Sequence, residues 1–232
     1  MRDTEPDTRS VDTSAFPGEL MIWLSASFPV GGFAYSQGLE TSVEKGWVSD
    51  RTTLANWLRG LLDHGSPRND LIFIGLIQRT GDLAETRELV ELAAALQPSC
   101  ERHDEAVVQG HSFVRAYEAA WQPGPSPFAG LPDTITLPAA LAVAARQHDI
   151  SVRATLEAYA IAFLNNLTSA AIRLGVVGQF DGQRIMAELL VPARAACCGS
   201  LNATEGDLGS ATWGADLASM LHETQSTRLF RS

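Results

Sequence analysis

The amino-acid sequence predicts an all-α protein, a single-domain bundle of about ten helices. Apolar residues recur at steps of three and four between Leu54 and Leu221, the spacing that places them on one face of an α-helix. No stretch between turn signals alternates polar and apolar residues as a half-buried strand does. The chain has 232 residues, 45% of them hydrophobic and 19% charged, which is typical of a soluble globular protein with a substantial core.

Capping and turn residues that precede apolar stripes divide the chain into its expected helices. In order, these helices span residues 17–25, 36–47, 50–62, 69–78, 82–96, 100–121, 137–149, 151–174, 182–191 and 213–224. The expected starts include Pro17, Ser36, Ser49 or Asp50, Asn69 or Asp70, Asp82, Ser99, Ser151 and Asp181-Gly182. Residues 71–78 are apolar on most sides, which favours a central helix.

Three segments are expected along the chain: a disordered N-terminal tail over residues 1–16, an all-α body over 17–224, and a C-terminal tail over 225–232. The first tail is polar and has little to bury. The proline-rich stretch 123–133 is the most linker-like part of the body. Because it is short and has similar helices on both sides, we interpret it as an internal loop.

Composition excludes several classes of partner and compartment. The formal net charge of −10 argues against nucleic acid or an anionic membrane as the main partner. The three cysteines do not make a disulfide framework, and the polar N-terminus has no apolar core of a signal peptide. No apolar run is long enough to span a bilayer. We therefore expect a cytoplasmic protein.

The most unusual stretch is the glycine loop, residues 26–40. Pro29 restricts the backbone before it, whereas Gly31 and Gly32 permit a sharp turn or a close approach. The loop also carries the apolar side chains of Phe28, Val30, Phe33 and Tyr35. A phosphate-binding loop would need a lysine directly after the glycines, and the next lysine is Lys45. We therefore expect a packed connection between helices and no nucleotide site.

No catalytic residue, metal ligand or cofactor is expected. His103 and His111 share a helix face but lie roughly 12 Å apart along its axis, too far to share one metal ion. Cys197 and Cys198 are adjacent, and neighbouring side chains on a helix point about 100° apart, which favours packing over chelation. An enzyme acting through a histidine or through the helix-face pair Glu40 and Glu44 remains a second hypothesis.

Polar residues interrupt the apolar helix before Arg173, in the run Asn165-Asn166-Leu167-Thr168-Ser169-Ala170-Ala171-Ile172-Arg173-Leu174-Gly175. Buried amides and hydroxyls must find hydrogen-bond partners, so such a run often specifies a packing interface. An internal network between helices and a contact between subunits are equally compatible with this pattern.

Three motifs together resemble the UreF family of urease accessory proteins. The first is Phe-Pro-Val-Gly-Gly-Phe-Ala-Tyr-Ser-Gln-Gly-Leu-Glu over residues 28–40. The second is the run that ends Arg-Leu-Gly at Gly175, followed by Gly178-Gln179 and Asp181-Gly182-Gln183. The third is His-Glu-Thr-Gln over 222–225, leading into Arg-Leu-Phe-Arg-Ser over 228–232. The resemblance covers nearly the whole chain.

The resemblance implies an all-α, non-catalytic urease accessory protein that forms a homodimer. Such proteins join a UreD/UreH-type accessory protein and the GTPase UreG in a complex that delivers nickel to apo-urease, coupled to GTP hydrolysis. The expected partner-binding residues are Phe28, Pro29, Gly31, Gly32, Tyr35, Ser36, Glu40, Arg173, Arg228, Leu229, Phe230 and Arg231. Regulation of the GTPase would require an arginine that reaches another protein's site. The alternative is a free-standing nickel-binding chaperone that uses Cys197 and Cys198.

The C-terminal tail is expected to order when a partner binds. Residues 225–232 are too few for a stable helix alone, yet they place Leu229 and Phe230 between two arginines. The glycine loop offers an aromatic ring at Tyr35, and Glu40 and Glu44 follow it with negative charge. We therefore expect Arg228 to meet the Tyr35 region when a UreD-type protein binds, which would build the surface that recruits the GTPase.

Overall fold

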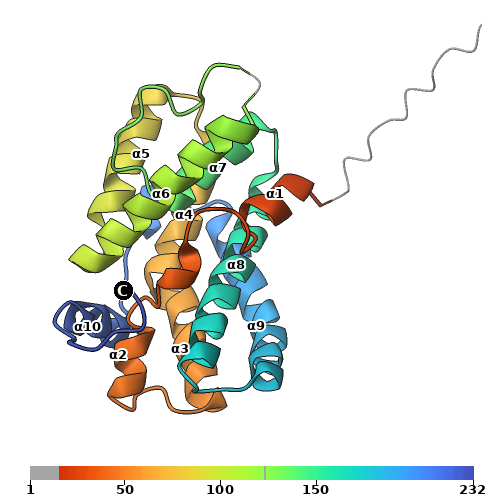
Figure 1. Ribbon diagram of the computed structural model, residues 1–232. Coiled ribbons are helices and arrows are strands. Elements are labelled where there is room, and N and C mark those ends of the chain that lie inside the picture. The colour runs from red at the N-terminus through yellow and green to blue at the C-terminus, as the bar shows by residue number, and fades with distance from the viewer. Residues whose placement is uncertain (1–15, 123) are drawn as a thin grey trace, which may run out of the picture.

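The computed structural model describes residues 16–122 and 124–232 (Figure 1). Its α-helices are α1 (Gly18–Trp23), α2 (Leu39–Glu44), α3 (Arg51–His64), α4 (Ser66–Arg79), α5 (Leu83–Ala95), α6 (Cys100–Ala120), α7 (Leu137–Gln147), α8 (Val152–Arg173), α9 (Gln179–Ser200) and α10 (Trp213–His222). Two 3-10 turns are η1 (Gly32–Ala34) and η2 (Glu205–Asp207). The described residues contain no strand, which confirms the all-α prediction. The expected N-terminal tail falls, except for Phe16, outside the described residues.

Helix α4 is the centre of the bundle. It packs against α3, α5, α7, α8 and α9, and Leu71, Ile74 and Ile77 are completely buried. A helix that touches neighbours all round must be apolar all round, as the sequence predicted for residues 71–78. Its neighbour α7 is rich in buried alanine between Ala139 and Ala145, and these small side chains let the two helices lie close together.

An aromatic cluster fixes the short helix α1 and hence the entry to the glycine loop. The Trp23 ring is buried and meets four rings edge-on at centroid distances of 5.1–6.0 Å, those of Phe113, Tyr117, Trp121 and His148. Edge-to-face pairs of this kind add to the stabilisation from burial. Because six residues make a marginal helix alone, this packing rather than propensity holds α1 in place.

Local capping signals predicted several helix starts correctly. The side chains of Asp50, Asp82, Ser99 and Ser151 each accept a hydrogen bond from a first-turn amide of the helix that follows. The prediction that Ser36 caps the next helix is wrong. Gly38 adopts a left-handed conformation (φ 78°) and is itself the N-cap of α2, which begins at Leu39; the Ser36 hydroxyl accepts from the Glu40 amide at 3.3 Å from outside the cap position.

Two other predicted starts are also wrong. Helix α4 begins at Ser66 rather than at Asn69 or Asp70, because Pro67 fits the first turn of a helix. Helix α9 begins at Gln179, runs through Asp181-Gly182, and continues past Pro192 to Ser200. Gly182 serves as a point of close approach to α8: an added Cβ would lie 3.0 Å from Ile172 Cδ1.

Candidate partner-binding site

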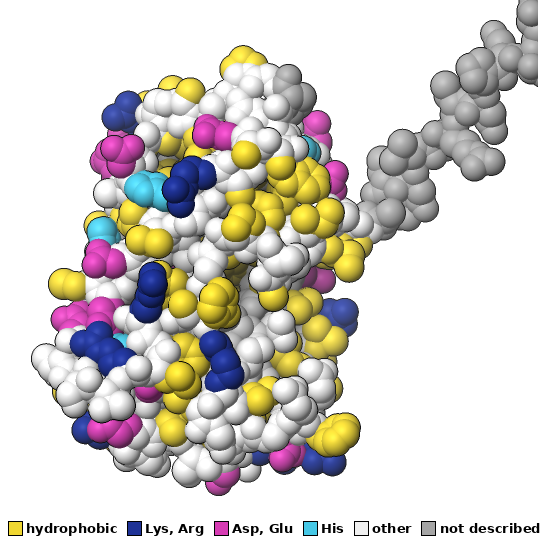
Figure 2. Space-filling view, viewed as in Figure 1, with side chains coloured by type: hydrophobic (Ala, Val, Ile, Leu, Met, Phe, Trp, Pro, Cys, Tyr) yellow, Lys and Arg dark blue, Asp and Glu magenta, His cyan; other side chains and the backbone are white. Residues whose placement is uncertain are grey.

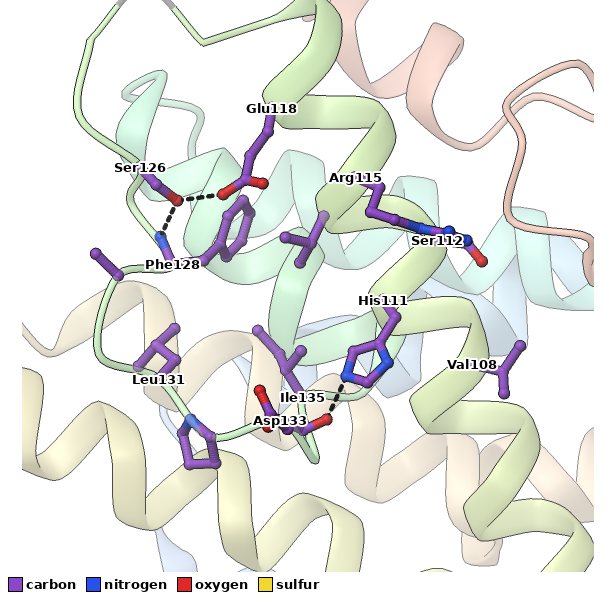
Figure 3. A pocket seen from close by; sticks show the side chains of 13 residues that line it. Val108, His111, Ser112, Arg115, Glu118, Ser126, Phe128, Leu131, Asp133 and Ile135 are labelled. Atoms are coloured by element: carbon purple, nitrogen blue, oxygen red, sulfur yellow. Dashed lines mark hydrogen bonds between the residues drawn. The ribbon is translucent and has the colours of Figure 1, made fainter.

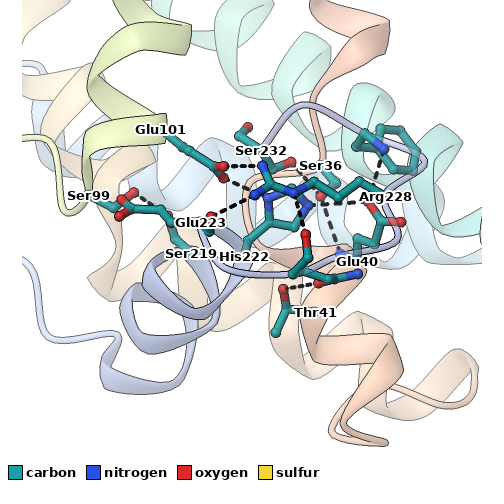
Figure 4. Close-up of polar contacts among 12 residues, drawn as sticks. Ser36, Glu40, Thr41, Ser99, Glu101, Ser219, His222, Glu223, Arg228 and Ser232 are labelled. Atoms are coloured by element: carbon teal, nitrogen blue, oxygen red, sulfur yellow. Dashed lines mark hydrogen bonds and ion pairs between the residues drawn. The ribbon is translucent and has the colours of Figure 1, made fainter.

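The C-terminal tail, residues 225–232, lies against the glycine loop beside α2 and α10 (Figures 1 and 4). The backbone amides of Ser36 and Gln37 both donate to the main-chain oxygen of Ser232, at 2.6 and 3.0 Å. The Ser36 hydroxyl donates to the same oxygen at 2.6 Å, and the Arg231 amide donates to the Ala34 carbonyl at 2.9 Å. Ser36 therefore holds the tail, while its hydroxyl also accepts from the Glu40 amide in the first turn of α2 at 3.3 Å.

Glu40 is the second anchor of the tail. It lies in the first turn of α2, where the helix dipole favours a carboxylate, and only 8% of the residue is exposed. Its Oε1 accepts from the Leu229 amide at 2.6 Å and its Oε2 from the Phe230 amide at 2.9 Å. Hydrogen bonds to an ionised acceptor are stronger than neutral ones. Glu44, by contrast, is half-exposed, and its ion-pair partner among the described residues is Lys45, at 3.9 Å.

A buried histidine joins this anchor to α6 and α10. His222 Nδ1 lies 2.6 Å from Glu101 Oε2, and His222 Nε2 lies 3.3 Å from Glu40 Oε2 (Figure 4). Arg228 donates to the other oxygen of Glu101 and to the carbonyls of Gln225 and Glu223. In the single chain Arg228 thus meets Glu101 on α6, and the tail lies against the loop; the predicted contact of Arg228 with the Tyr35 region concerns the partner-bound state and stays a prediction.

Arg173, the last residue of α8, contacts both the glycine loop and the tail. Its guanidinium donates to the Phe33 carbonyl and lies 4.4 Å from the centroid of the Phe230 ring. A cation over an aromatic face is attracted by the ring quadrupole. Partial burial lowers the pKa of Arg173 because it disfavours the charged form. The polar run at the end of α8 therefore contributes to an internal network in the single chain.

Beneath the tail, the buried carboxylate of Glu105 on α6 accepts hydrogen bonds from several side chains. Glu105 pairs with Arg102 and accepts from the Ser232 hydroxyl. It also accepts from the side-chain amides of Gln37 and Gln109, at 3.1 and 3.0 Å. A buried charge is tolerated when it is paired and fully hydrogen-bonded, and Glu105 meets both conditions.

A second buried acid lies close to this group. Asp70 on α4 accepts a hydrogen bond from the Tyr159 hydroxyl of α8 at 2.7 Å. Burial raises the pKa of Asp70 to about 6, although the hydrogen bond from Tyr159 and the charge of Arg102 act in the opposite direction. The polar contacts beneath the tail thus extend into the helical core.

Some of the predicted partner-binding residues are structural and others face outward. Phe28, Tyr35 and Phe230 are buried, and Phe28 packs on Phe113 at a centroid distance of 5.3 Å. Leu229 faces outward and is 63% exposed. Phe33, which was not among the predicted partner-binding residues, is similarly exposed at 67%. Three predicted arginines are also exposed: Arg173, Arg228 and Arg231. On the face of the molecule shown in Figure 2, basic side chains lie among hydrophobic ones.

Sequence reasoning missed the acceptors that receive the tail. Glu101 and Glu105 are one helical turn apart on α6, a spacing that usually indicates solvated surface groups. Arg102 between them is the one local signal of pairing, because it forms an ion pair with Glu105 one turn away. Their burial depends on α10 and the tail, more than 100 residues further along the chain, so no local pattern reveals it.

A separate hollow of about 610 Å³ lies between α6 and the loop before α7 (Figure 3). Its polar rim is largely paired within the chain: Ser126 donates to Glu118, and the His111 ring bonds the Asp133 carbonyl. Phe128 and Ile135 from the loop are buried in the core. The hollow reflects the packing of this loop onto α6 and agrees with its interpretation as an internal loop.

The described residues contain no group of three or more His, Cys, Asp or Glu side chains arranged to hold a metal ion. The carboxylates of Glu40 and Glu101 contact opposite nitrogens of His222 and do not converge on one point. Cys197 is buried, which raises the pKa of its thiol to about 12, whereas Cys198 is exposed beside Arg153. Across the same residues, no helix combines the length and apolar character that crossing a bilayer requires.

The fold and the site define the class of protein first: a helical protein whose main polar network holds its own C-terminal segment. The family model for UreF matches residues 48–190. Proteins named urease accessory protein UreF are similar along almost their whole length: one from Rhodopseudomonas palustris (strain BisA53) is 41% identical over 99% of this chain and 98% of its own. Another, from Methylorubrum populi, is 45% identical over 92% and 97%. The chain belongs to the UreF family, whose members are non-catalytic accessory proteins.

Proposed function

We propose that this protein acts in the cytoplasm as a urease maturation chaperone. In this role it bridges a UreD/UreH-type protein and the GTPase UreG and supports GTP-dependent nickel insertion into apo-urease. Relatives that match almost the whole chain carry the name urease accessory protein, which supports the link to urease. The observation that carries the bridging role is the docked tail, because it builds one composite surface from three distant segments of the chain.

This composite surface has the chemistry of a protein-binding site. Its exposed apolar anchors are Phe33 and Leu229. Exposed Arg173 donates to the Phe33 carbonyl, and exposed Arg231 lies two residues after Leu229 in the chain. Aromatic residues and arginines are enriched among the residues that dominate binding energy in interfaces. Because the tail supplies two of these four residues, binding of a partner is coupled to docking of the tail.

The proposed order of events begins with the UreD/UreH-type protein. Its binding favours the docked arrangement of residues 225–232, and the completed surface then recruits the GTPase. A two-fold homodimer presents two copies of this surface, since each protomer carries the same patch. Arg231 is the best candidate for a side chain that reaches the GTPase: it is exposed, and only its backbone forms a bond among the described residues.

Co-purification of the full chain with both accessory partners tests this proposal. Leu229→Asp places a charge on the outer surface while the Leu229 amide can still donate to Glu40, so the tail should remain docked. We expect recruitment of the GTPase to weaken at least about tenfold, as the loss of one interface anchor does. Leu83→Asp, at a similarly exposed position (51%) on α5, is the matched control. Assembly of the Leu229→Asp variant at wild-type affinity would contradict the proposed surface.

A further inference from the structure

The His222 side chain has an acceptor at each of its two ring nitrogens. The ring is completely buried, with Glu101 Oε2 2.6 Å from Nδ1 and Glu40 Oε2 3.3 Å from Nε2. Both carboxylates also accept from other donors, Glu101 from Arg228 and Glu40 from two tail amides. Such bonds favour ionised carboxylates, so both ring nitrogens must donate. An imidazole donates from both nitrogens only when it is protonated.

The charged groups around this ring come from every element that packs against it. Helix α2 contributes Glu40, α6 contributes Glu101, and the tail contributes Arg228 through its bond to Glu101. Directly after α10, the carboxylate of the C-cap residue Glu223 accepts from the Cys100 amide at 2.9 Å. Two carboxylates therefore contact the ring directly, and one guanidinium lies beyond the second of them.

We propose that protonated His222 is a pH-sensitive latch that holds the C-terminal tail in its docked position. When the ring loses its proton, one nitrogen presents a lone pair to a buried carboxylate, and that carboxylate loses a charged donor. A buried carboxylate that faces a lone pair and has lost its charged donor is destabilised, even though its other donors remain. The carboxylate then turns toward water and gives up its other donors. For Glu40 these donors are the amides of Leu229 and Phe230, so the tail is released.

The direction of the pH dependence follows from proton linkage. Only the doubly protonated ring donates to both carboxylates, so raising the pH removes one donor from the docked arrangement and favours release, whereas lowering the pH favours docking. The inference rests on the proposed function only in taking the docked tail as the partner surface, since the latch itself is a property of the single chain.

Hydrogen exchange of the isolated full-length protein tests the latch. The reporters are the backbone amides of Leu229 and Phe230, with their exchange rates expressed relative to the intrinsic rate at each pH. We expect their protection to fall at least about tenfold between about pH 6 and pH 9, as a histidine-linked opening requires. In His222→Gln, whose single amide group cannot bridge two carboxylates as a cation, protection should be low and equal at both pH values.

His103→Gln is the matched control, because His103 lies on α6 with 41% of its side chain exposed and contacts only the neighbouring Asp104. This variant should keep the wild-type pH dependence. Wild-type protection that does not change with pH, or a His222→Gln variant that retains the transition, would overturn the proposal. If His222→Gln does not fold, the ¹⁵N shifts of the wild-type ring decide: a neutral His222 beneath a docked tail at pH 6 excludes the latch. Because no partner is present, these outcomes are independent of whether the urease role is correct.

Discussion

At the scale of single residues, the docked tail depends on buried carboxylates with more than one donor. Glu40 receives two backbone amides, and Glu105 receives an arginine, a hydroxyl and two amides. Removing one donor leaves part of the buried carboxylate without a hydrogen bond, and this loss costs more free energy than the bond itself contributes. The tail therefore docks as a unit, since each of its bonds supports an acceptor that others share.

The glycine pair of the loop gives a matched test of backbone strain. Gly31 has φ 73°, a left-handed conformation that side chains disfavour, whereas Gly32 begins η1 and is not in that region. Gly31→Ala should lower the free energy of unfolding by at least about 1 kcal/mol. Gly32→Ala should change it by less than about 0.5 kcal/mol, because the added Cβ would meet only Asn166 Oδ1 at 4.0 Å. Equal urea-unfolding free energies for the two variants would contradict this assignment of strain.

Asp70 predicts a second effect, on the pH dependence of stability. Burial raises the pKa of Asp70 from 3.8 to about 6, so the folded state holds this proton more tightly than the unfolded state. The contribution of Asp70 to stability is therefore greatest below the unfolded pKa and falls as the pH rises from about 4 to about 6. Asp70→Asn cannot titrate, so its stability relative to wild type should increase across this window.

Urea unfolding of wild type and Asp70→Asn at several pH values measures this difference directly. Asp104→Asn is the control, because that side chain is 80% exposed. Its difference from wild type should stay nearly constant. A difference for Asp70→Asn that is equally constant between pH 4 and pH 7 would show that burial does not hold the Asp70 proton.

At the scale of elements, the sequence predicts those helix starts that are determined by residues close together in the chain. Asp50, Asp82, Ser99 and Ser151 were identified as caps because the amides they bind lie within three residues. The start of α9 was missed because an Asp-Gly pair ordinarily indicates a turn. Only the contact with α8 shows that Gly182 is there for close packing inside a helix.

The contact between α6 and the loop before α7 provides a test at this scale. A Cβ at Gly110 would lie 2.0 Å from the Ile135 carbonyl oxygen and 2.8 Å from the Thr136 carbonyl carbon, and backbone cannot yield as a side chain can. Gly110→Ala should destabilise the protein by roughly 2 kcal/mol or more, as overpacking of a core does. Gly60→Ala in α3 has nothing within 4 Å of its added Cβ and should stabilise the helix by up to about 1 kcal/mol. Thermal unfolding that shifts in the same direction for both variants would contradict the close approach.

At the scale of the whole molecule, the sequence singled out segments that lie together in the structure but did not predict the contacts between them. The loop with Ser36 and Glu40, the arginine at the end of α8 and the tail were all predicted to take part, and the structure brings them together. The contact of Arg228 with Glu101 in the single chain and the roles of Glu101 and Glu105 were not foreseen. These contacts join residues more than 100 positions apart, so they depend on the packing of α6, α10 and the tail and leave no periodic trace in the sequence.

The most direct test of the central claim is the nickel content of urease after reconstituted activation. Apo-urease would be incubated with nickel, GTP, a UreD/UreH-type protein and a UreG-type GTPase, with or without this chain, and the metal in re-isolated urease measured. The account predicts GTP-dependent nickel insertion only when this chain is present, and strong impairment with Leu229→Asp but not with Leu83→Asp. Equal insertion without the chain, or delivery by the nickel-loaded chain alone without the GTPase, would contradict it.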